Sequence, residues 1–410
     1  MPALSPRASR VLAWTLLAAG VGYFLLAGTL RQILRPYGYA SDFATFYSAA
    51  RAFTTGEDPY ARERLASELA PEFSGWVGRY FYPPPFAAVA LRPLVALPFA
   101  EARRLWVVLE SAAYLGAGFL LVKILFGVAS AWPFVAAGVV LLYFTPMRVD
   151  LKLGSVSGLL LLLFALFLFA RSRRAEVAAA CALAAMIVLK LAPAVLLFHA
   201  ACRGQFRLLR HTVLACLLLL VAALPWTGWR AYETYATSVL PQLLTQRFAW
   251  FTNQSLDAFF TRLFLPNPDS TPWLDAPALA TTLIVTTSLA VLVTLALLAR
   301  HEAQSADDSV WGPALALLAS LLLARVTWES MVVLSLPCFL LCLRACWMLE
   351  VSPPLLLTWG VAWALCALPF PYVDPPHRSG AGLLLESPRL YGILLLFATS
   401  AHWRLRRRRT

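Results

Sequence analysis

Long apolar segments, separated by short polar ones, recur from one end of the chain to the other. The first extends from Val11 to Leu30 and the last from Leu390 to Ala401. A transmembrane helix needs about 20 mostly apolar residues to cross the hydrocarbon core of a bilayer. The pattern therefore predicts a single all-α polytopic membrane domain over residues 1–410, with roughly ten to twelve transmembrane segments.

The composition supports this interpretation. Of the 410 residues, 60% are hydrophobic and 13% are charged, and the mean hydropathy is +0.71. Soluble domains usually carry about 25% charged residues, so we expect no large water-soluble domain. The first apolar segment is longer than a signal-peptide core of about 7–15 residues, and we expect it to remain as a membrane anchor.

The basic residues lie beside the apolar segments, although a net charge of +13 would also suit a nucleic-acid-binding protein. They occur at Arg7 and Arg10, at Arg171, Arg173 and Arg174, at Arg203, Arg207 and Arg210, and at Arg404 and Arg406–Arg409. Short basic segments that flank spans mark the cytoplasmic side, and a terminal basic run also attracts anionic lipid headgroups. We therefore expect no nucleic-acid partner, and a cytoplasmic tail at residues 404–410.

Two long polar segments, residues 31–82 and 225–275, contain many of the aromatic and acidic residues outside the spans. With the N-terminus in the cytoplasm, both segments are predicted to be extracytoplasmic loops. We expect a multi-pass protein of the plasma membrane whose chemistry takes place on the extracytoplasmic side.

The alternation of sides meets a difficulty in the first half of the chain. If Pro85–Leu97 returns through the membrane and Arg103–Arg104 marks the inner face, simple alternation places Arg171–Arg174 outside, against its charge. One segment must therefore be a half-span or a re-entrant hairpin, which is tolerated where it lines a cavity or is buried in protein. The interruptions at Pro146–Gly154 and Leu189–Pro193 are both candidates.

The cysteines and histidines show no metal-site pattern. All seven cysteines fall within or at the ends of apolar segments, and Cys338, Cys342 and Cys346 repeat every four residues along one helix face. No histidine or carboxylate accompanies them, so we expect packing between helices and no disulfide framework. The histidines have no ligand spacing, and the chain has no glycine-rich nucleotide fingerprint. We expect neither a metal nor a cofactor.

The first polar segment contains a predicted helix that begins near Ser41. Apolar residues recur at helical spacing, at Phe43, Phe46, Ala50 and Phe53, which predicts an amphipathic helix lying on the membrane. Ser41 or Asp42 is expected to cap the start of this helix and Gly56 to close it. Capping would also hold the Asp42 carboxylate ionised and in a fixed orientation.

Several short motifs follow one another in a definite order. They are Asp42-Phe-x-x-Phe-Tyr-x-Ala-Ala-Arg51, Gly56-x-Asp58-Pro59-Tyr60, Tyr82-Pro-Pro, Leu97-Pro98 before Leu105-Trp106, Leu189-Lys190-Leu191-Ala192-Pro193, Asn253-Gln254-Ser255-Leu256 and Arg325-Val326-Thr327-Trp328-Glu329. With these motifs the chain resembles glycosyltransferase family 87 of the GT-C superfamily over most of its length. Two departures affect the sugar and the acceptor. Gly154-Ser-Val-Ser stands where many members read Gly-Gln-x-Asn, and Ser330-Met331 stands where many carry histidine.

The resemblance implies a GT-C-type bundle that transfers a hexose, mannose by analogy with the family, from a polyprenyl-phosphate sugar to an extracytoplasmic glycolipid or polysaccharide. It also implies that Asp42 is the catalytic base. Such a reaction needs a base for the acceptor hydroxyl, positive charge at the departing phosphate and an apolar groove for the lipid. A phosphate leaving group needs no general acid, so one carboxylate suffices, whereas a retaining glycosidase requires two about 5 Å apart.

The donor-binding candidates are mainly charged and amide side chains. Lys190, Arg247 and Arg325 are candidate phosphate partners, because charge within a membrane segment indicates function by default. Lys190 could equally extend to an interface. The simplest alternative for Arg325 is an i,i+4 ion pair with Glu329.

The other candidates are Tyr82, Trp328, Asn253 and Gln254. The two amides either hydrogen-bond sugar hydroxyls or cap a loop helix. Tyr82 belongs to a proline-fixed turn that is either an interfacial anchor or part of the ligand site. Trp328, together with Glu329, is a candidate through the family motif.

Two further functions are alternatives to glycosyl transfer. A lipid or solute transporter would also carry buried charges, but transporters usually show paired repeats with broken helices in both halves, and here the halves differ. A ligase or polymerase of lipid-linked polysaccharide is a related third possibility.

Overall fold

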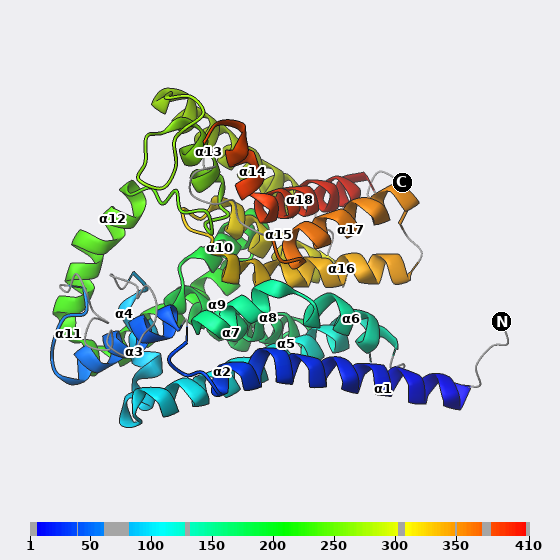
Figure 1. The fold of residues 1–410 in the computed structure, drawn as a ribbon, viewed down its shortest axis with the longest axis horizontal. Helices are drawn as coiled ribbons and strands as arrows, with labels where there is room; N and C mark the ends of the chain where they lie inside the picture. Colours follow the sequence, from blue (N-terminus) through cyan, green and yellow to red (C-terminus); the bar gives the residue numbers. More distant parts are fainter. Residues whose placement is uncertain are drawn as a thin grey trace. The chain divides into compact units, whose positions relative to one another are not determined.

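The structure is a computed structural model, which describes residues 6–38, 40–60, 82–127, 132–301, 308–348, 351–370 and 379–406. The described chain is almost entirely helical (Figure 1), which confirms the predicted all-α membrane fold. It divides into two compact units, one formed by residues 1–190 and 212–237 and the other by residues 191–211 and 238–410. Predictions for residues 61–81, 371–378 and the tail beyond 406 lie outside the described residues.

The first unit contains most of the N-terminal helices. They are α1 (Pro6–Phe24), η1 (Leu25–Leu30), α2 (Arg31–Ile33), α3 (Ser41–Thr54), α4 (Pro85–Leu91), η3 (Arg92–Ala96), α5 (Phe99–Phe126), α6 (Trp132–Leu142), α7 (Thr145–Leu153), α8 (Ser157–Ser172) and α9 (Glu176–Leu189). Helix α5 packs along α8, α8 packs on α9, and α1 packs on α6. The later part of α11 (Phe206–Thr234) also belongs to this unit.

The second unit is built around α15 (Asp308–Leu323). Its other elements are η4 (Ala192–Ala194), α10 (Val195–Cys202), α12 (Leu240–Thr245), α13 (Leu256–Phe264), α14 (Pro277–His301), η6 (Glu329–Ser335), α16 (Leu336–Trp347), α17 (Pro353–Ala367), η8 (Gly380–Glu386) and α18 (Pro388–Arg406), with η5 (Tyr235–Val239) at the boundary. Helix α15 contacts α10, α14, α16 and α18. Its leucines, such as Leu317 and Leu321, are completely buried, so this helix forms the core of the unit.

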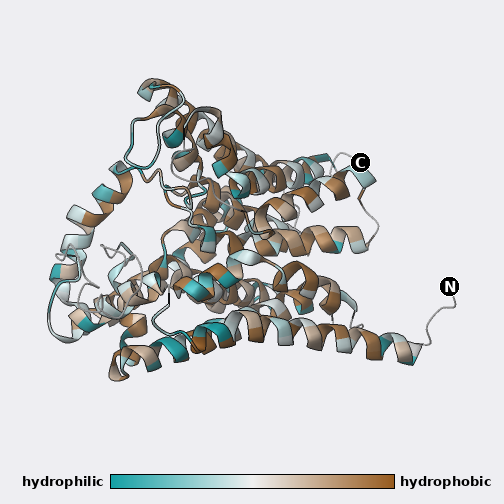
Figure 2. Cartoon of the chain, viewed as in Figure 1, coloured by the Kyte–Doolittle hydropathy of each residue, from teal (hydrophilic) through white to brown (hydrophobic). Residues whose placement is uncertain are grey.

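Several helices have the length and composition of membrane spans. Five helices in the described part of the chain qualify, or up to seven if each of two bent pairs is one span. One such pair is α6 with α7, which meet at an angle of 58°. Six shorter apolar segments accompany them. Figure 2 shows apolar residues along most long helices and hydrophilic residues on the loops beside α12 and α13.

The segment Pro85–Leu97 is shorter than the membrane span that the sequence predicts there. Its seven residues of α4 and five of the 3-10 helix η3 reach about 20 Å, at about 1.5 and 2.0 Å per residue, against a hydrocarbon core of about 30 Å. Both elements pack against α3, and the Tyr47 hydroxyl donates to the Leu97 carbonyl at 2.8 Å. Arg103, which follows in α5, lies over the Phe43 ring of α3. It therefore lies at the α3 end and does not mark the opposite face.

This correction also removes the difficulty at Arg171–Arg174. With α4 and η3 on the same side as α3, simple alternation along α1, α5, the α6–α7 pair and α8 returns Arg171–Arg174 to the side of Arg7. The breaks predicted near Pro146 and at Lys190 are real interruptions between helices. Neither of them is needed to explain the charge pattern.

Candidate active site

Asp42 lies in the first turn of α3, and its side chain is only partly exposed. The predicted capping role is wrong, because Ala40 occupies the cap position and no side chain accepts a capping hydrogen bond there. Instead, the Ser41 hydroxyl donates to Asp42 Oδ1 at 3.5 Å. Gly56, with φ +74°, follows the helix end as expected. The Asp42 carboxyl therefore does not cap the helix.

The apolar face of α3 is covered by protein and does not lie on the membrane surface. Phe43, Phe46, Ala50 and Phe53 are all buried, as their helical spacing predicted. Phe43 packs on Phe99 and Trp106 of α5, with ring centroids 5.5 and 6.2 Å apart. This packing fixes the rotation of α3 and hence the direction of Asp42.

The surroundings of Asp42 combine burial with positive charge. Burial raises the pKa of the Asp42 carboxyl above its ordinary value, and the nearby charge of Lys190 opposes this rise. The hydroxyls of Ser155 and Ser41 lower the pKa further, followed by the charge of Arg103. A carboxyl whose pKa is raised is a better proton acceptor.

Arg103 holds the break between α7 and α8 against α3. It is 1% exposed, and its Nη2 donates to the carbonyl oxygens of Leu151 and Lys152, the latter at 3.2 Å. Its guanidinium carbon lies 5.6 Å from the Phe43 ring centroid, a cation–π contact. Arg103 was expected at the inner membrane face, and it is instead a buried component of this site.

Gly154 ends α7 beside Phe43 of α3 and Arg103 of α5. Its φ is +72°, and a Cβ there would lie 2.6 Å from the Phe43 Cβ and 2.9 Å from Arg103 Nη1. Trp106 Nε1 donates to the carbonyl oxygens of Gly154 and Ser155 at 3.2 and 3.1 Å. Both the conformation and the close approach therefore require glycine.

A second group of acidic residues lies behind Asp42. Asp150 is completely buried, and the Tyr114 hydroxyl donates to its Oδ2 at 2.8 Å. Glu110 is 2% exposed and accepts from the backbone N–H groups of Gly158 and Leu159 at 2.8 and 3.2 Å. Its carboxylate thus caps the start of α8, where negative charge is favoured.

The sequence analysis missed Asp150, Glu110 and Tyr114. A signal was available, because Glu110 lies in the middle of the apolar segment Phe99–Phe126, and an ionisable residue within a span indicates a functional site. Arg103, Glu110 and Tyr114 also recur at helical spacing on α5. Together they line the side of α5 that meets α7 and α8.

Lys190 separates α9 from η4 in an extended conformation, with φ −157° and ψ 128°. Its side chain is partly exposed and interacts electrostatically with Asp42 and Asp150. The helix break at Pro193 therefore places a cation beside the candidate base. The sequence left two roles open for Lys190, a functional charge within the membrane segment or a side chain that extends to an interface. Its interaction with Asp42 and Asp150 favours the first role.

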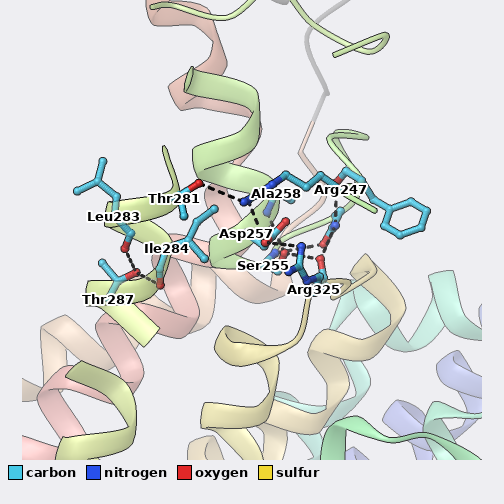
Figure 3. A network of polar contacts seen from close by, with 11 residues as sticks. Arg247, Ser255, Asp257, Ala258, Thr281, Leu283, Ile284, Thr287 and Arg325 are labelled. Carbon is cyan, nitrogen blue, oxygen red and sulfur yellow. Dashed lines mark hydrogen bonds and ion pairs between the residues drawn. The ribbon is translucent and has the colours of Figure 1, made fainter. Parts of the chain in front are cut away.

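Arg247 and Arg325 meet at one carboxylate in the second unit (Figure 3). Their Nη1 atoms lie 3.2 and 3.4 Å from Asp257 Oδ2. Asp257 was not predicted from the sequence. Burial raises the pKa of its carboxyl, and the charges of Arg325 and Arg247 counteract that rise. The two predicted phosphate partners are therefore neighbours, although 78 positions separate them in the sequence.

The alternative ion pair between Arg325 and Glu329 is not formed. Glu329 is paired with Arg389 of α18, which is 1% exposed. Glu329 belongs to η6 and Arg389 to α18. The packing of these two helices therefore decides the partner of Glu329, and its i,i+4 spacing from Arg325 does not. Glu329 was a candidate donor ligand, and its carboxylate is instead part of a buried ion pair that joins two helices.

The Asn253 side chain is completely buried and makes only backbone contacts. Its Nδ2 donates to Phe248 O and Arg325 O at 2.9 and 3.0 Å. Its Oδ1 accepts from Thr327 N and Ser255 N at 2.9 and 3.3 Å. Both donors and both acceptor positions are used, so the expectation that Asn253 binds a sugar hydroxyl is not supported by this geometry.

Gln254 has a similar role. Its Nε2 donates to Phe251 O and Glu386 O, each at 2.8 Å, and its Oε1 accepts from Leu390 N at 3.3 Å. It is completely buried, so it too is a poor sugar ligand. The amide fastens the loop before α13 to the start of α18, which corrects the functional interpretation of this motif.

Tyr82 and Trp328 are both partly exposed. The turn at Tyr82 is fastened by Tyr60, whose hydroxyl donates to Pro83 O at 2.6 Å, which agrees with the predicted rigid turn. Trp328 forms an isolated antiparallel bridge with Asn253 through the backbone. Its ring remains a candidate ligand surface.

The predicted site residues thus form two groups, each within one unit. Asp42 and Lys190 lie together in the first unit, and Arg247, Arg325, Trp328 and the two amides lie in the second. Among the described residues, no three His, Cys, Asp or Glu side chains are grouped as metal ligands would be. The described cysteines are free, as predicted.

Comparison with known proteins gives one positive result. The family model of glycosyltransferase family 87 matches residues 80–324, a range that contains Lys190, Arg247 and Asp257 but begins after Asp42. No curated protein and no solved structure matches the chain. The match covers more than half of the sequence, and the helical bundle agrees with the membrane glycosyltransferase that the motifs resembled. The chain belongs to glycosyltransferase family 87.

Proposed function

We propose that this membrane glycosyltransferase transfers a hexose, mannose as the first choice, from a polyprenyl-phosphate sugar to an extracytoplasmic glycolipid or glycan, with inversion and with Asp42 as the base. The observation that carries the proposal is the Asp42 carboxyl. This carboxyl is partly exposed and does not cap the helix. Burial raises its pKa, and the charge of Lys190 acts on it.

The chemistry requires little more than this arrangement. Asp42 takes the proton of the acceptor hydroxyl as its oxygen forms a bond to the anomeric carbon. The bond from that carbon to the phosphate oxygen breaks, and its electrons leave with the polyprenyl phosphate. Lys190 is the cation that acts most strongly on Asp42, and it favours the ionised form of the base.

The side of the membrane on which we place Asp42 follows from the corrected order of the membrane spans. With Arg7 and Arg171–Arg174 in the cytoplasm by the positive-inside rule, the start of α3 lies on the extracytoplasmic side. A lipid-linked donor is available there, whereas nucleotide sugars are not expected outside the cytoplasm. Family membership favours a transferase over the transporter considered from the sequence.

The test is transfer by the purified protein in lipid nanodiscs. Radiolabelled polyprenyl-phosphate mannose and, separately, a radiolabelled nucleotide-linked mannose are incubated with bacterial lipid extract, and products are separated by chromatography. We expect label to move to an acceptor only from the lipid-linked donor, and not with Asp42→Asn. Glu101→Gln is the matched control, because Glu101 is an exposed carboxylate at the start of α5. Normal turnover by Asp42→Asn would refute the assignment of the base.

A further inference from the structure

The two arginines in Figure 3 share a single oxygen of Asp257. The side chains of Arg247 and Arg325 are 26% and 34% exposed, while that of Asp257 is 8% exposed. Each guanidinium group carries five N–H donors and stays protonated at any physiological pH. One carboxylate oxygen uses few of these donors. Both cations therefore present further N–H groups toward solvent.

The second unit holds this arrangement in place. Arg247 Nη2 contacts Thr281 Oγ1 of α14 at 3.5 Å. The Arg325 backbone carbonyl accepts from Asn253 Nδ2 at 3.0 Å and from Ser255 Oγ at 2.9 Å. The same Ser255 hydroxyl accepts from the Ala258 N–H and caps α13, which carries Asp257 in its first turn. The cations and their anion are thus fixed by one hydrogen-bonded loop.

The charges of this cluster do not cancel. Two guanidinium groups and one carboxylate leave one positive charge. A phosphodiester carries one negative charge at all physiological pH values and would bring the sum to zero. A phosphomonoester carries about −1.5 to −2 at pH 7 and would leave the cluster negative, with Asp257 repelling the additional charge.

We propose that Arg247, Arg325 and Asp257 form a binding site for a lipid phosphodiester, in which Asp257 discriminates against phosphomonoesters. The inference rests on the proposed function. The sugar donor is a phosphodiester and its product, polyprenyl phosphate, is a phosphomonoester. Discrimination by Asp257 therefore weakens the binding of the spent carrier relative to the donor and limits inhibition by product.

The test measures binding without catalysis. Full-length protein carrying Asp42→Asn is titrated with methyl farnesyl phosphate, a phosphodiester, and with farnesyl phosphate, a phosphomonoester, at pH 7.5 and low salt. Dihexanoyl phosphatidylglycerol is the third probe, because a glycerophospholipid is the other source of a lipid phosphodiester. Binding is followed by isothermal titration calorimetry, and folding by size-exclusion chromatography.

In this protein we expect the monoester to exceed the diester in affinity by a smaller factor than in the Asp257→Asn variant, because Asp257 opposes the additional charge of the monoester. Removing one repulsive charge about 4 Å away is worth a factor of about 5 per ligand charge in a water-like dielectric. Asp257→Asn is therefore expected to strengthen monoester binding about 25-fold and diester binding about 5-fold. Asp257→Glu is expected to keep the original ratio, and Arg325→Gln to weaken both ligands. Phosphatidylglycerol, which is also a phosphodiester, should respond to Asp257→Asn as methyl farnesyl phosphate does.

Three results would overturn the proposal. Asp257→Asn could leave both affinities unchanged or raise them by the same factor, or Arg325→Gln could bind both probes normally. Displacement of methyl farnesyl phosphate by phosphatidylglycerol would support the phosphodiester site and identify a glycerophospholipid as its second source of ligand. The two proposals fail separately, because sugar transfer is measured with Asp42 intact and the charge discrimination is measured with Asp42 removed.

Discussion

The two units organise charge in opposite ways. Around Asp42, three carboxylates (Asp42, Asp150 and Glu110) accompany two cations, Arg103 and Lys190, so full ionisation would leave an excess negative charge. Around Asp257, two arginines accompany one carboxylate and leave an excess positive charge. The first cluster is mostly buried and the second is partly open to solvent.

The difference indicates what each cluster is suited to do. A buried group with excess negative charge favours uptake of a proton, which is the task of a general base. A partly exposed group with excess positive charge favours binding of an anion. The same elementary rule of charge compensation therefore produces a proton acceptor in one unit and an anion site in the other. Four changes test this contrast.

The largest expected effect comes from making the same substitution in both clusters. Asp42→Asn removes the base and should lower kcat by about 10²–10⁴-fold, whereas Asp257→Asn should change kcat by less than about 10-fold. Because burial raises the pKa of folded Asp42, the stability given by its protonated form is lost as the pH rises from the unfolded value through the folded one. At neutral pH, Asp42→Asn should therefore be at least as stable as the original protein in thermal unfolding. Equal losses of kcat in the two variants would remove the contrast.

Gly154→Ala should cause the next largest effect, by disturbing the backbone that supports the first cluster. A left-handed conformation costs alanine about 1–2 kcal/mol, and overpacking adds about 1–3 kcal/mol, because the new Cβ would meet Phe43 and Arg103. We expect a loss of about 2–5 kcal/mol, measured by equilibrium unfolding in detergent. Gly22→Ala is the control, since a Cβ there meets nothing within 4 Å. Equal stability of the two variants would contradict the close approach.

Asn253→Ala tests whether the second cluster depends on a side-chain clamp. The substitution leaves the Arg325 carbonyl and the Thr327 N–H without their amide partner, and one buried unsatisfied group costs about 1–3 kcal/mol. We expect a loss of about 2–4 kcal/mol and weaker phosphodiester binding, with both measured on the same preparation. A direct sugar ligand would instead change the KM for the sugar and leave the unfolding midpoint unaltered.

The smallest effect is a displacement of a pH profile. Lys190 lowers the pKa of Asp42, so Lys190→Gln should raise that pKa, and the base should become active only at higher pH. The acid limb of kcat/KM should therefore move to higher pH. Arg247→Gln should leave the limb in place, because Arg247 is not among the charges that act on Asp42. A displacement in both variants would show that the clusters are not independent.

Sequence reasoning predicted much of the fold and part of the site. Hydrophobic segments, helical spacing in α3 and the helix break at Pro193 all followed from local chemistry. The functional roles of Asp42 and Lys190 stay predictions. Sequence reasoning did not predict which charged side chains form ion pairs with one another. Glu329 pairs with Arg389, 60 positions away, and not with Arg325 one turn away, because packing of η6 and α18 decides which charges are brought together.

The amides show the same limit. An Asn-Gln pair in a polar loop is compatible with sugar binding or with a structural role, since both use the same donors and acceptors. Only the complete set of backbone partners distinguishes the two. Similarly, Pro85–Leu97 is apolar enough to suggest a span, and only the structure shows that this short segment packs against α3.

The amino-acid sequence by itself determined that this chain is a bundle of membrane helices with a carboxylate at the start of the helix in its first polar segment, because hydropathy and helical period are local properties. The tertiary structure alone decided which charges surround Asp42 and that Asp257 joins Arg247 to Arg325. Those groups are distant in sequence, and the strength of a charge interaction depends on separation in space and on burial.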